Sequence, residues 1–581
     1  MTSKKTLESK ISKILIYLKV FYREARYACS LRRNVRSNFL KVQRAINSWH
    51  QIIGIKNNSN IDLNLKVMFV TGYGLGSHYL AIEPIIWAAL RLRGVKVCSL
   101  YCNKSLPCCE FNTNGNMSPP IELEYRRGIR KSTCLHGCNT CASNLKSLYN
   151  ELSIENYGLN EYLGDSDYID AWEIAKNIPV EGFRSYIYDD IKVGEEAYSS
   201  ILRVTFKGEI ANDTLLIKRY LYSGILTVIG YEKAFKAIKP DRVVCIHGVY
   251  QTHGLAVKVC NKLNIRVVVV GGGGIRKNTV VMCHGETYHH QLINEDNNLW
   301  INNQLSDAQK MLVVNYANSK RYNGAGVDYL NYHPNPINNI DYLYSTYGLD
   351  PKRKIITLYT NVAWDAQIVY RSNVFNDMFD WIFYTINLLG NSQDCYLIIR
   401  IHPAEAKGGL IPRQLAADEI NKMFPILPEN VIIIKPESDF SSYTLAEHSD
   451  LNVIYGTKMG LEIALMKRPL LVCGESFSRN KGYGVDIISK DQYKRIVKNV
   501  DSVDLDLNSC YELALKYAYY LYFQRMLDLP IVSDSSNHSL KFKDASELGA
   551  GSPVMEIICN GIIRLEPFVY INYLPCATNI L

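Results

Sequence analysis

Residues 65–76 read LKVMFVTGYGLG, an apolar run that enters a loop with glycine at every second position. The run predicts a buried strand, and the apolar-periodic residues 81–92 predict the helix that follows it. Residues 95–101 predict a second strand. Strand, glycine loop, helix and strand in this order form a βαβ unit, whose right-handed crossover makes the sheet parallel. The loop then lies at the C-terminal edge of the first strand, where open α/β sheets bind ligands, so Gly74 and Gly76 are candidate cleft residues.

A second βαβ unit is predicted further along the chain. Two valine-rich strands, residues 242–246 and 265–270, flank a helix at residues 255–263. Together the two units predict a Rossmann-like N-terminal domain over residues 61–335. Residues 331–339 are rich in turn-forming side chains and predict a linker.

Strands and helices alternate again after the linker, which predicts a second Rossmann-like domain over residues 350–500. Residues 505–581 are expected to form a helix that crosses back over the first domain, followed by a tail. The predicted fold is therefore α/β, with two doubly wound Rossmann-like domains facing a central cleft. The predicted strands of the second domain are residues 354–360, 395–401, 431–434, 452–455 and 469–473.

The 581-residue chain has a formal net charge of +9, and this excess lies entirely in its first 50 residues, which hold twelve Lys or Arg and two Glu. Within residues 1–60, apolar side chains recur at roughly helical spacing among the basic ones, as in an amphipathic basic helix. Such a segment either contacts an anionic membrane surface or packs on its own protein. The rest of the chain shows no basic stripe with stacking aromatics, so we expect no nucleic-acid partner.

The composition is that of a folded globular protein, with 47% hydrophobic and 21% charged residues. This balance excludes a disordered or collagen-like chain. The sequence shows neither a run of about 18 apolar residues nor a signal-peptide pattern. The expected location is the cytoplasm, with the basic segment as a peripheral contact to the inner face of the cell membrane.

Six cysteines lie within forty residues, from Cys102 to Cys141, and mark residues 98–141 as a cysteine-rich insertion. Four thiolates can hold a structural zinc, which Cys134, Cys138 and Cys141 could form with Cys108 or Cys109; the tentative set is Cys109, Cys134, Cys138 and Cys141. The same CxxxCxxC spacing also holds iron–sulfur clusters in radical S-adenosylmethionine enzymes. Disulfides or unligated thiols are the third alternative.

A motif at the end of one predicted strand, residues 400–405, reads RIHPAE. Arg400 and His402 share one side of the pleat, and a guanidinium and an imidazole that point into a cleft suit phosphate oxygens. Alternatively, Arg400 pairs with a nearby acid and His402 is a satisfied loop histidine.

A second motif, residues 455–462, reads YGTKMGLE and predicts a turn from strand to helix. Thr457 can cap the helix, whose first amides can hold a phosphate. Glu462 can accept two hydroxyls of a ribose, or it can merely interact favourably with the helix dipole.

These two motifs, with residues 467–474 (KRPLLVCG), resemble the R-x-H-P, S/T-x-x-G-L-E-A and G-x-P-V-x-x-x-G elements of capsule polysaccharide biosynthesis proteins. These are GT-B-type glycosyltransferases that include bacterial Kdo transferases. The resemblance covers chiefly residues 350–490. It implies a nucleotide-sugar donor and, as acceptor, a surface glycan or its lipid-linked precursor. The resemblance implies that His402, Thr457 and Glu462 bind the donor. Arg400, Glu405, Gly456 and Gly460 of the same motifs are further candidate donor-binding residues, and Asn361 and Asp365 are other candidate cleft residues.

Whether transfer retains or inverts the sugar configuration stays open; an inverting transferase needs a base near the acceptor hydroxyl and positive charge near the departing phosphate. The candidate bases are His78, Glu83 and His247, which follow strand ends of the first domain. No D-x-D pair stands at a suitable strand end, so we expect no metal or other cofactor in catalysis. The alternatives are a radical S-adenosylmethionine enzyme, a sugar-nucleotide epimerase and a non-catalytic nucleotide- or carbohydrate-binding scaffold.

Overall fold

The structure is a computed structural model of the 581-residue chain. It describes residues 40, 43–44, 47–49, 51–52, 64–71, 73–75, 77–110, 135–210, 214–272, 276–323, 328, 335–366, 373–407, 412–533 and 538–571. Most of the predicted basic segment 1–60 therefore lies outside the described residues, as do Gly76, Cys134 and the side chain of His78. No helix in the described ranges combines the length and the apolar character needed to cross a membrane.

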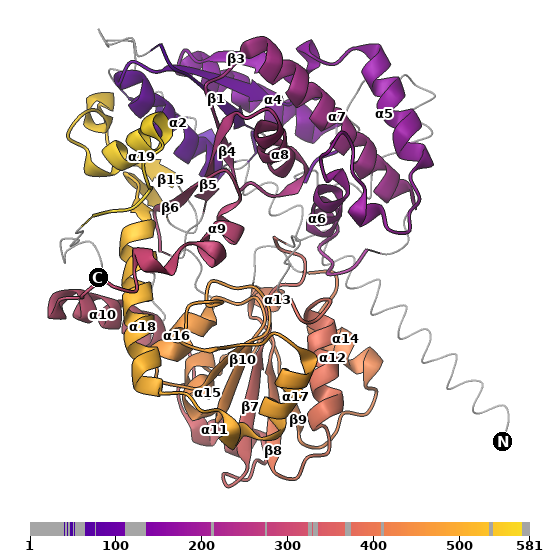
Figure 1. The fold of residues 1–581 in the computed structure, drawn as a ribbon, viewed down its shortest axis with the longest axis vertical. Coiled ribbons are helices and arrows are strands. Elements are labelled where there is room, and N and C mark those ends of the chain that lie inside the picture. Colours follow the sequence, from indigo (N-terminus) through magenta and orange to yellow (C-terminus); the bar gives the residue numbers. More distant parts are fainter. Residues whose placement is uncertain are drawn as a thin grey trace, which may run out of the picture.

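Two sheets organise the described part of the chain, and each lies in one lobe of the molecule (Figure 1). We call each sheet with its helices a unit. The first sheet has the order β13-β6-β5-β4-β1-β2-β3. Its neighbouring strands β5, β4, β1, β2 and β3 run parallel. Its strands are β1 (Lys66–Thr71), β2 (Lys96–Tyr101), β3 (Glu155–Gly158), β4 (Arg242–Ile246), β5 (Arg266–Gly272), β6 (Thr279–His284) and β13 (Leu527–Asp528).

The second sheet has the order β12-β11-β10-β7-β8-β9, and all its strands are parallel. Helices cover both faces of each sheet, so the predicted α/β fold class with two doubly wound units is confirmed. The strands are β7 (Lys354–Tyr359), β8 (Cys395–Arg400), β9 (Val431–Ile434), β10 (Leu451–Ile454), β11 (Leu470–Val472) and β12 (Val485–Asp486).

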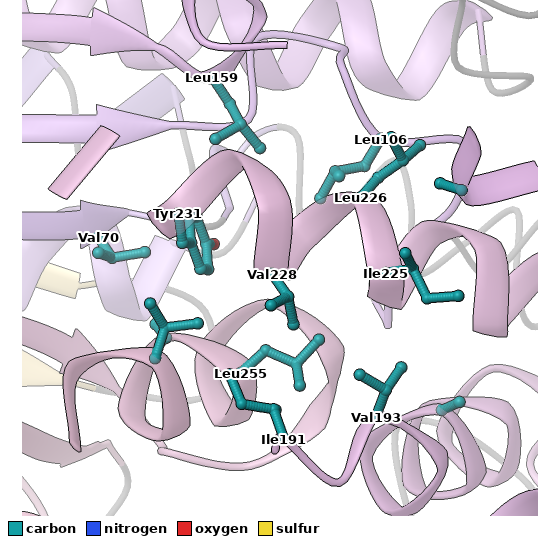
Figure 2. Packing of buried hydrophobic residues seen from close by; sticks show 14 of the residues in the cluster. Val70, Leu106, Leu159, Ile191, Val193, Ile225, Leu226, Val228, Tyr231 and Leu255 are labelled. Atoms are coloured by element: carbon teal, nitrogen blue, oxygen red, sulfur yellow. The ribbon is translucent and has the colours of Figure 1, made fainter. Parts of the chain in front are cut away.

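The central strand β1 shows why these residues form a buried parallel sheet. Val67 and Phe69 pack on one face of the sheet, and Met68 and Val70 pack on the other. A strand that is buried on both faces is a continuous apolar run rather than an alternating one. Figure 2 shows part of the core on the Val70 face, where side chains of the long helix α7 meet those of neighbouring helices and loops.

The helices of the first unit lie on its two faces. One face is covered by α2 and α4 together with the C-terminal α19, and the other by α5 to α8. These helices are α2 (Ser77–Leu92), α4 (Leu135–Glu151), α5 (Asp165–Asn177), α6 (Val193–Thr205), α7 (Thr214–Ile238), α8 (Leu255–Lys262) and α19 (Pro553–Arg564). Cys98, predicted to open the cysteine-rich insertion, lies within β2.

The helices between the sheets and around the second sheet follow the predicted alternation. Two of them, α9 and α10, lead from the first unit to the second (Figure 1). They are α9 (Tyr288–Asn294), α10 (Asp307–Asn323), α11 (Ile340–Tyr347), α12 (Met378–Leu389), α13 (Ala404–Lys407), α14 (Ala416–Met423), α15 (Ser442–His448), α16 (Met459–Leu465) and α17 (Lys490–Lys498).

The C-terminal part of the chain returns to the first unit. Helix α18 (Leu507–Tyr519) packs on α10 and α16 and continues as a π-helical turn, Tyr520–Arg525, into the strand β13. Strand β13 pairs antiparallel with β6 and adds an edge to the first sheet. A hairpin of β14 (Ile531–Ser533) and β15 (His538–Leu540) follows, and α19 then packs on α2. The tail expected after the crossover helix thus contains a hairpin and a helix.

Candidate active site

Each parallel sheet has a point where its strand order reverses, and ligands bind in open α/β sheets at such switch points. In the first sheet the reversal lies between β1 and β4, beside the glycine loop and His247. In the second sheet it lies between β7 and β10, beside Asn361 and Gly456. Sheet topology alone therefore selects these four loops as the walls of a candidate site.

The loop after β4 has an unusual backbone. His247, Gly248 and Tyr250 all have φ between +66° and +72°, a region that non-glycine residues rarely adopt. Two hydrogen bonds hold the loop: the His247 N–H donates to Val270 O (2.9 Å), and the Thr287 hydroxyl donates to His247 O (2.8 Å). Strain of this kind persists where surrounding structure enforces it, commonly at functional sites.

This loop touches the second unit through Tyr250. The ring of His247 stacks on that of Tyr250, with centroids 5.4 Å apart and 19° between the planes. The Tyr250 hydroxyl donates to Asp365 Oδ1 (3.4 Å) and accepts the Ala366 N–H (3.0 Å). The ring of His289, on α9, lies 5.3 Å from that of His247. The structure thus brings together two residues nominated from sequence, His247 and Asp365, through a tyrosine that was not nominated.

The charge state of His247 follows from its surroundings. Burial lowers its pKa to about 4; Asp365 opposes this shift and Arg203 adds to it. The imidazole is therefore neutral at pH 7. Its Nδ1 is buried and has no hydrogen-bond partner among the described residues, while the side chain as a whole keeps some exposure. A neutral imidazole within reach of solvent can accept a proton from a substrate hydroxyl.

We call the place where these loops of the two units meet the crevice, and a lysine of the second unit lies near it. Lys458 precedes α16, its side chain is exposed, and it makes no hydrogen bond or ion pair with any residue in the described ranges. Surrounding protein lowers the pKa of Lys458, with Asp365 among the groups that oppose the shift. Burial lowers the pKa of His289 well below its usual range. Positive charge on His247 and on Lys458 lowers it further, in that order. A cation without a carboxylate partner suits an anionic ligand.

A cavity of about 370 Å³ lies beside this crevice, between α6 of the first unit and the loops after β7 and β10. Most of its lining comes from the second unit and includes Asn361 and Tyr455. Asn361 borders Gly456, and its Oδ1 is buried without a hydrogen-bond partner in the described part of the chain. From the first unit, the Arg184 guanidinium stacks on Tyr198 at 4.3 Å. The cavity has the size and mixed lining of small-molecule sites.

The structure corrects the prediction for Arg400. Its side chain is only 2% exposed, so it does not face a cleft. Its guanidinium donates to the carbonyl oxygens of Lys435 (2.8 Å), Ser438 (3.1 Å) and Phe440 (3.3 Å) and to the Ser442 hydroxyl (3.1 Å). These bonds occupy the donors that a phosphate would need, so Arg400 holds the 435–442 segment instead.

The neighbouring Glu405 is also engaged inside the protein. It is buried and accepts the Ala416 N–H at 3.0 Å, and burial raises the pKa of Glu405 to about 7. The prediction that it binds the donor is therefore corrected. His402 is half-buried, and its Nδ1 accepts the Ala404 N–H at 3.1 Å. It lies two residues after β8, one strand beyond the switch point, and does not line the cavity.

Glu462 is paired rather than free to accept ribose hydroxyls. Its carboxylate forms an ion pair with Lys320 of α10 and accepts the Tyr443 hydroxyl at 3.4 Å. Lys320 also pairs with Asp328 at 3.0 Å. Lys320 and Glu462 are 8% and 12% exposed, so the pair is largely desolvated. The prediction of a ribose contact is corrected: Glu462 ties α16 to α10.

Replacing Lys320 with Met should lower the free energy of unfolding by about 3 to 5 kcal/mol, because it removes the cationic partner of the largely desolvated Glu462 carboxylate. Urea unfolding followed by circular dichroism measures this. The double variant Lys320→Met/Glu462→Gln should recover part of the loss. A double variant that is no more stable than the single one would contradict the pairing as the source of the effect.

The remaining second-sheet candidates differ in their surroundings. Thr457 Oγ1 accepts the Met459 N–H at 3.5 Å, a long cap, and Lys458 is the residue that directly precedes α16. Gly460 is needed for packing, since a Cβ there would lie 2.3 Å from Ser478 Oγ. Among the described residues, His402 and Thr457 share no contact and neither lines the cavity. Their joint binding of one anion stays a prediction.

The glycine loop of the first sheet is closed by the cysteine-rich insertion. A Cβ on Gly74 would lie 2.2 Å from Cys141 O, and the Gly74 N–H donates to Cys141 Sγ at 3.0 Å. The glycine is thus required for the approach of α4. Glu83, a candidate base, is fully buried on α2, where a substrate cannot reach it, and this prediction is corrected.

The predicted metal site is only partly described. Cys109, Cys138 and Cys141 lie in the described ranges, and Cys134 does not. The described residues contain no group of three side chains placed to hold a metal ion. A zinc site completed by Cys134 stays a prediction.

Sequence reasoning missed Lys458, which stands inside the quoted stretch 455–462, and Tyr250. Lys458 is the middle residue of the Gly-Thr-Lys-Met-Gly turn, and Tyr250 follows His247 by three positions. The turn follows a predicted strand, and this position at a strand end could have marked Lys458 as a candidate site residue. Nothing in the sequence marks Tyr250 as the residue that reaches the second unit.

Comparison with known proteins gives structural similarity at low sequence identity. No protein-family model and no curated protein sequence matches the chain. The beta Kdo 2,4 transferase KpsC of Thermosulfurimonas dismutans is 13% identical, over 53% of this chain and 87% of that one, with a TM-score of 0.33. The UDP-GlcNAc 2-epimerase of Neisseria meningitidis is 10% identical, over 78% and 96%, with a TM-score of 0.23. MnaA of S. aureus, solved with UDP, is 12% identical, over 86% and 96%, with a TM-score of 0.25. The solved structures to which the chain is similar thus include a Kdo transferase and UDP-GlcNAc 2-epimerases.

Proposed function

We propose that this protein is a GT-B-type glycosyltransferase that moves a sugar from a nucleotide-sugar donor to a surface polysaccharide or its lipid-linked precursor. One observation carries the proposal: the switch-point loops of two doubly wound sheets meet, and a neutral, partly exposed histidine faces the crevice with a lysine that has no ion-pair partner among the described residues. A base and a fixed positive charge on opposite walls are what glycosyl transfer to a hydroxyl requires.

In this proposal the donor lies across the second switch point. The nucleoside occupies the cavity beside Asn361 and Tyr455, and the phosphates face Lys458. His247 accepts the proton of the acceptor hydroxyl as its oxygen bonds to the anomeric carbon. The bond from that carbon to the phosphate oxygen breaks, and Lys458 stabilises the negative charge that leaves with the nucleotide. Tyr250 and Asp365 hold the two walls together during the step.

Replacing Lys458 with Gln should weaken binding of a nucleoside diphosphate about tenfold or more, because a charge-assisted contact contributes roughly 1.5 to 3 kcal/mol. A thermal-shift series against CMP, UDP and GDP first identifies the base. Titration then gives the dissociation constant of the diphosphate and of the matching nucleoside. The nucleoside should bind the variant and the original protein equally.

The matched control is Lys467→Gln, which removes an exposed lysine that bonds Asn508 outside the crevice. It should leave both affinities unchanged. Equal diphosphate affinity for the Lys458 variant and the original protein would overturn the placement of the phosphates.

The activity itself is tested by following donor and product with and without a glycan acceptor. Release of nucleotide that depends on the acceptor supports transfer. Conversion of the donor to its sugar epimer without acceptor would replace the proposal with an epimerase. Nucleotide binding without any donor turnover would indicate a binding scaffold.

A further inference from the structure

A buried polar contact lies beneath the strained loop of His247. The π-helical turn Tyr250–Gly254 follows that loop, and all of its residues are buried. The Thr252 N–H donates to both carboxylate oxygens of Glu110 (3.3 Å each), and the Thr252 hydroxyl donates to one of them. Both side chains are 1% exposed. Glu110 precedes Thr252 by 142 positions, so this is a tertiary contact that fixes the turn from below.

Further hydrogen bonds tie the Glu110 segment and the turn to the helices around them. Cys108 O accepts from Gln251 Nε2 (3.2 Å) and from the Ser223 hydroxyl of α7 (2.6 Å). The Gln251 N–H donates to the Ser200 hydroxyl of α6 (2.8 Å). The turn is therefore held to residues 108–110 on one side and to α6 on the other.

The turn is also confined by the side chain of Glu196. A Cβ on Gly254 would lie 2.4 Å from the carboxylate of Glu196, so the turn passes directly against a second buried acid. Burying carboxyl groups is costly, and an apolar contact would hold a turn at lower cost. Burial raises the pKa of Glu110 to about 7, which reflects that cost. A polar contact retained under such a penalty fits a role in fixing one geometry.

We infer that Glu110 and Thr252 are positioning residues, which hold the turn so that Tyr250 reaches the second unit and His247 keeps its place in the crevice. The expected loss of kcat rests on the proposed function. The expected change in amide exchange rests on the hydrogen bonds alone. Glu110 touches no candidate substrate position; it acts through the turn, whose first residue carries the hydroxyl that meets Asp365 and Ala366.

The kinetic test is a double-mutant cycle between Glu110→Ala and Tyr250→Phe. Each single variant should lower kcat about tenfold or more with the nucleotide dissociation constant unchanged. Glu110→Gln should restore most of the rate, because the amide oxygen still accepts from Thr252. The double variant should be no slower than the slower single variant, since both act on one contact. Additive losses, or a loss of nucleotide affinity in place of rate, would overturn the inference.

A hydrogen-exchange measurement tests the same inference without any activity. Glu110→Ala should speed amide exchange in residues 246–254 and, across the crevice, in residues 361–366. Tyr220→Phe is the matched control, because it removes a buried hydroxyl that bonds Cys109 O and makes no hydrogen bond to the turn or to Glu110. It should leave both segments unchanged.

If Glu110→Ala fails to fold, Thr252→Val removes the hydroxyl at nearly constant shape and should give the same exchange pattern. Unchanged exchange at 361–366 would overturn the inference even if transfer is demonstrated. Increased exchange at both segments in a protein that transfers no sugar would support the positioning role and reject the proposed function.

Discussion

His247→Gln should lower the rate of sugar transfer by about 10²- to 10⁴-fold, the usual contribution of a general base, and leave nucleotide affinity unchanged. The imidazole stacks on Tyr250 within reach of both units, and its buried setting keeps it neutral and able to accept a proton. Glutamine has similar polarity and cannot act as a base at neutral pH. Single-turnover kinetics with saturating donor measure the effect on the chemical step.

The dependence of this rate on pH has a definite sign. Burial lowers the pKa of His247 to about 4, so the basic form is complete at neutral pH and the rate should fall only as pH drops below about 5. A rate that falls near pH 6.5 would indicate an ordinary histidine and contradict the assignment. The control is His448→Gln, an exposed histidine bonded to Thr444 O far from the crevice, which should not change the rate.

Arg400→Met should lower the free energy of unfolding by at least about 3 kcal/mol, because each buried acceptor left without a donor costs roughly 1 to 3 kcal/mol. Arg400 donates to three carbonyls and one hydroxyl of the segment 435–442, and methionine replaces none of these bonds. Urea unfolding measures the stability. Nucleotide affinity, measured well below the unfolding transition, should be that of the original protein.

The control for Arg400 is substitution by Lys, which keeps the charge and loses the planar fork. Lysine cannot reach acceptors on several sides at once, so Arg400→Lys should lose most of the same stability. A stable Arg400→Met variant that no longer binds nucleotide would restore the phosphate role expected from the motif.

The fold could be predicted because its signals are local. The apolar run of β1 carries its own periodicity, and the glycine loop after it marks the strand end. Each βαβ unit then fixes its own crossover and so the parallel sheet. Strand β13 escaped prediction because two residues, Leu527 and Asp528, are too few to show a pattern.

The candidate site was predicted only in part, because a side chain's role depends on partners that are distant in the sequence. Glu462 stands where a ribose contact was expected, but Lys320, 142 positions away, engages its carboxylate. Arg400 stands at the expected strand end, and the carbonyls that occupy it come from a later loop. Positive φ at His247 could not be foreseen either, since no glycine marks that position.

The pairing of β13 with β6 and the packing of α19 on α2 have a consequence for biosynthesis. Residues 354–498 leave the ribosome before residues 527–564, so the second unit can fold on a nascent chain whose first sheet still lacks an edge strand. Until translation passes Arg564, the apolar surface of α2 that meets Met555, Ile558 and Ile562 stays open to chaperones and to other nascent chains. Exposed apolar surface of this kind makes partly folded chains prone to aggregate, and α19, the last helix of the described residues to be synthesised, is the one that covers it.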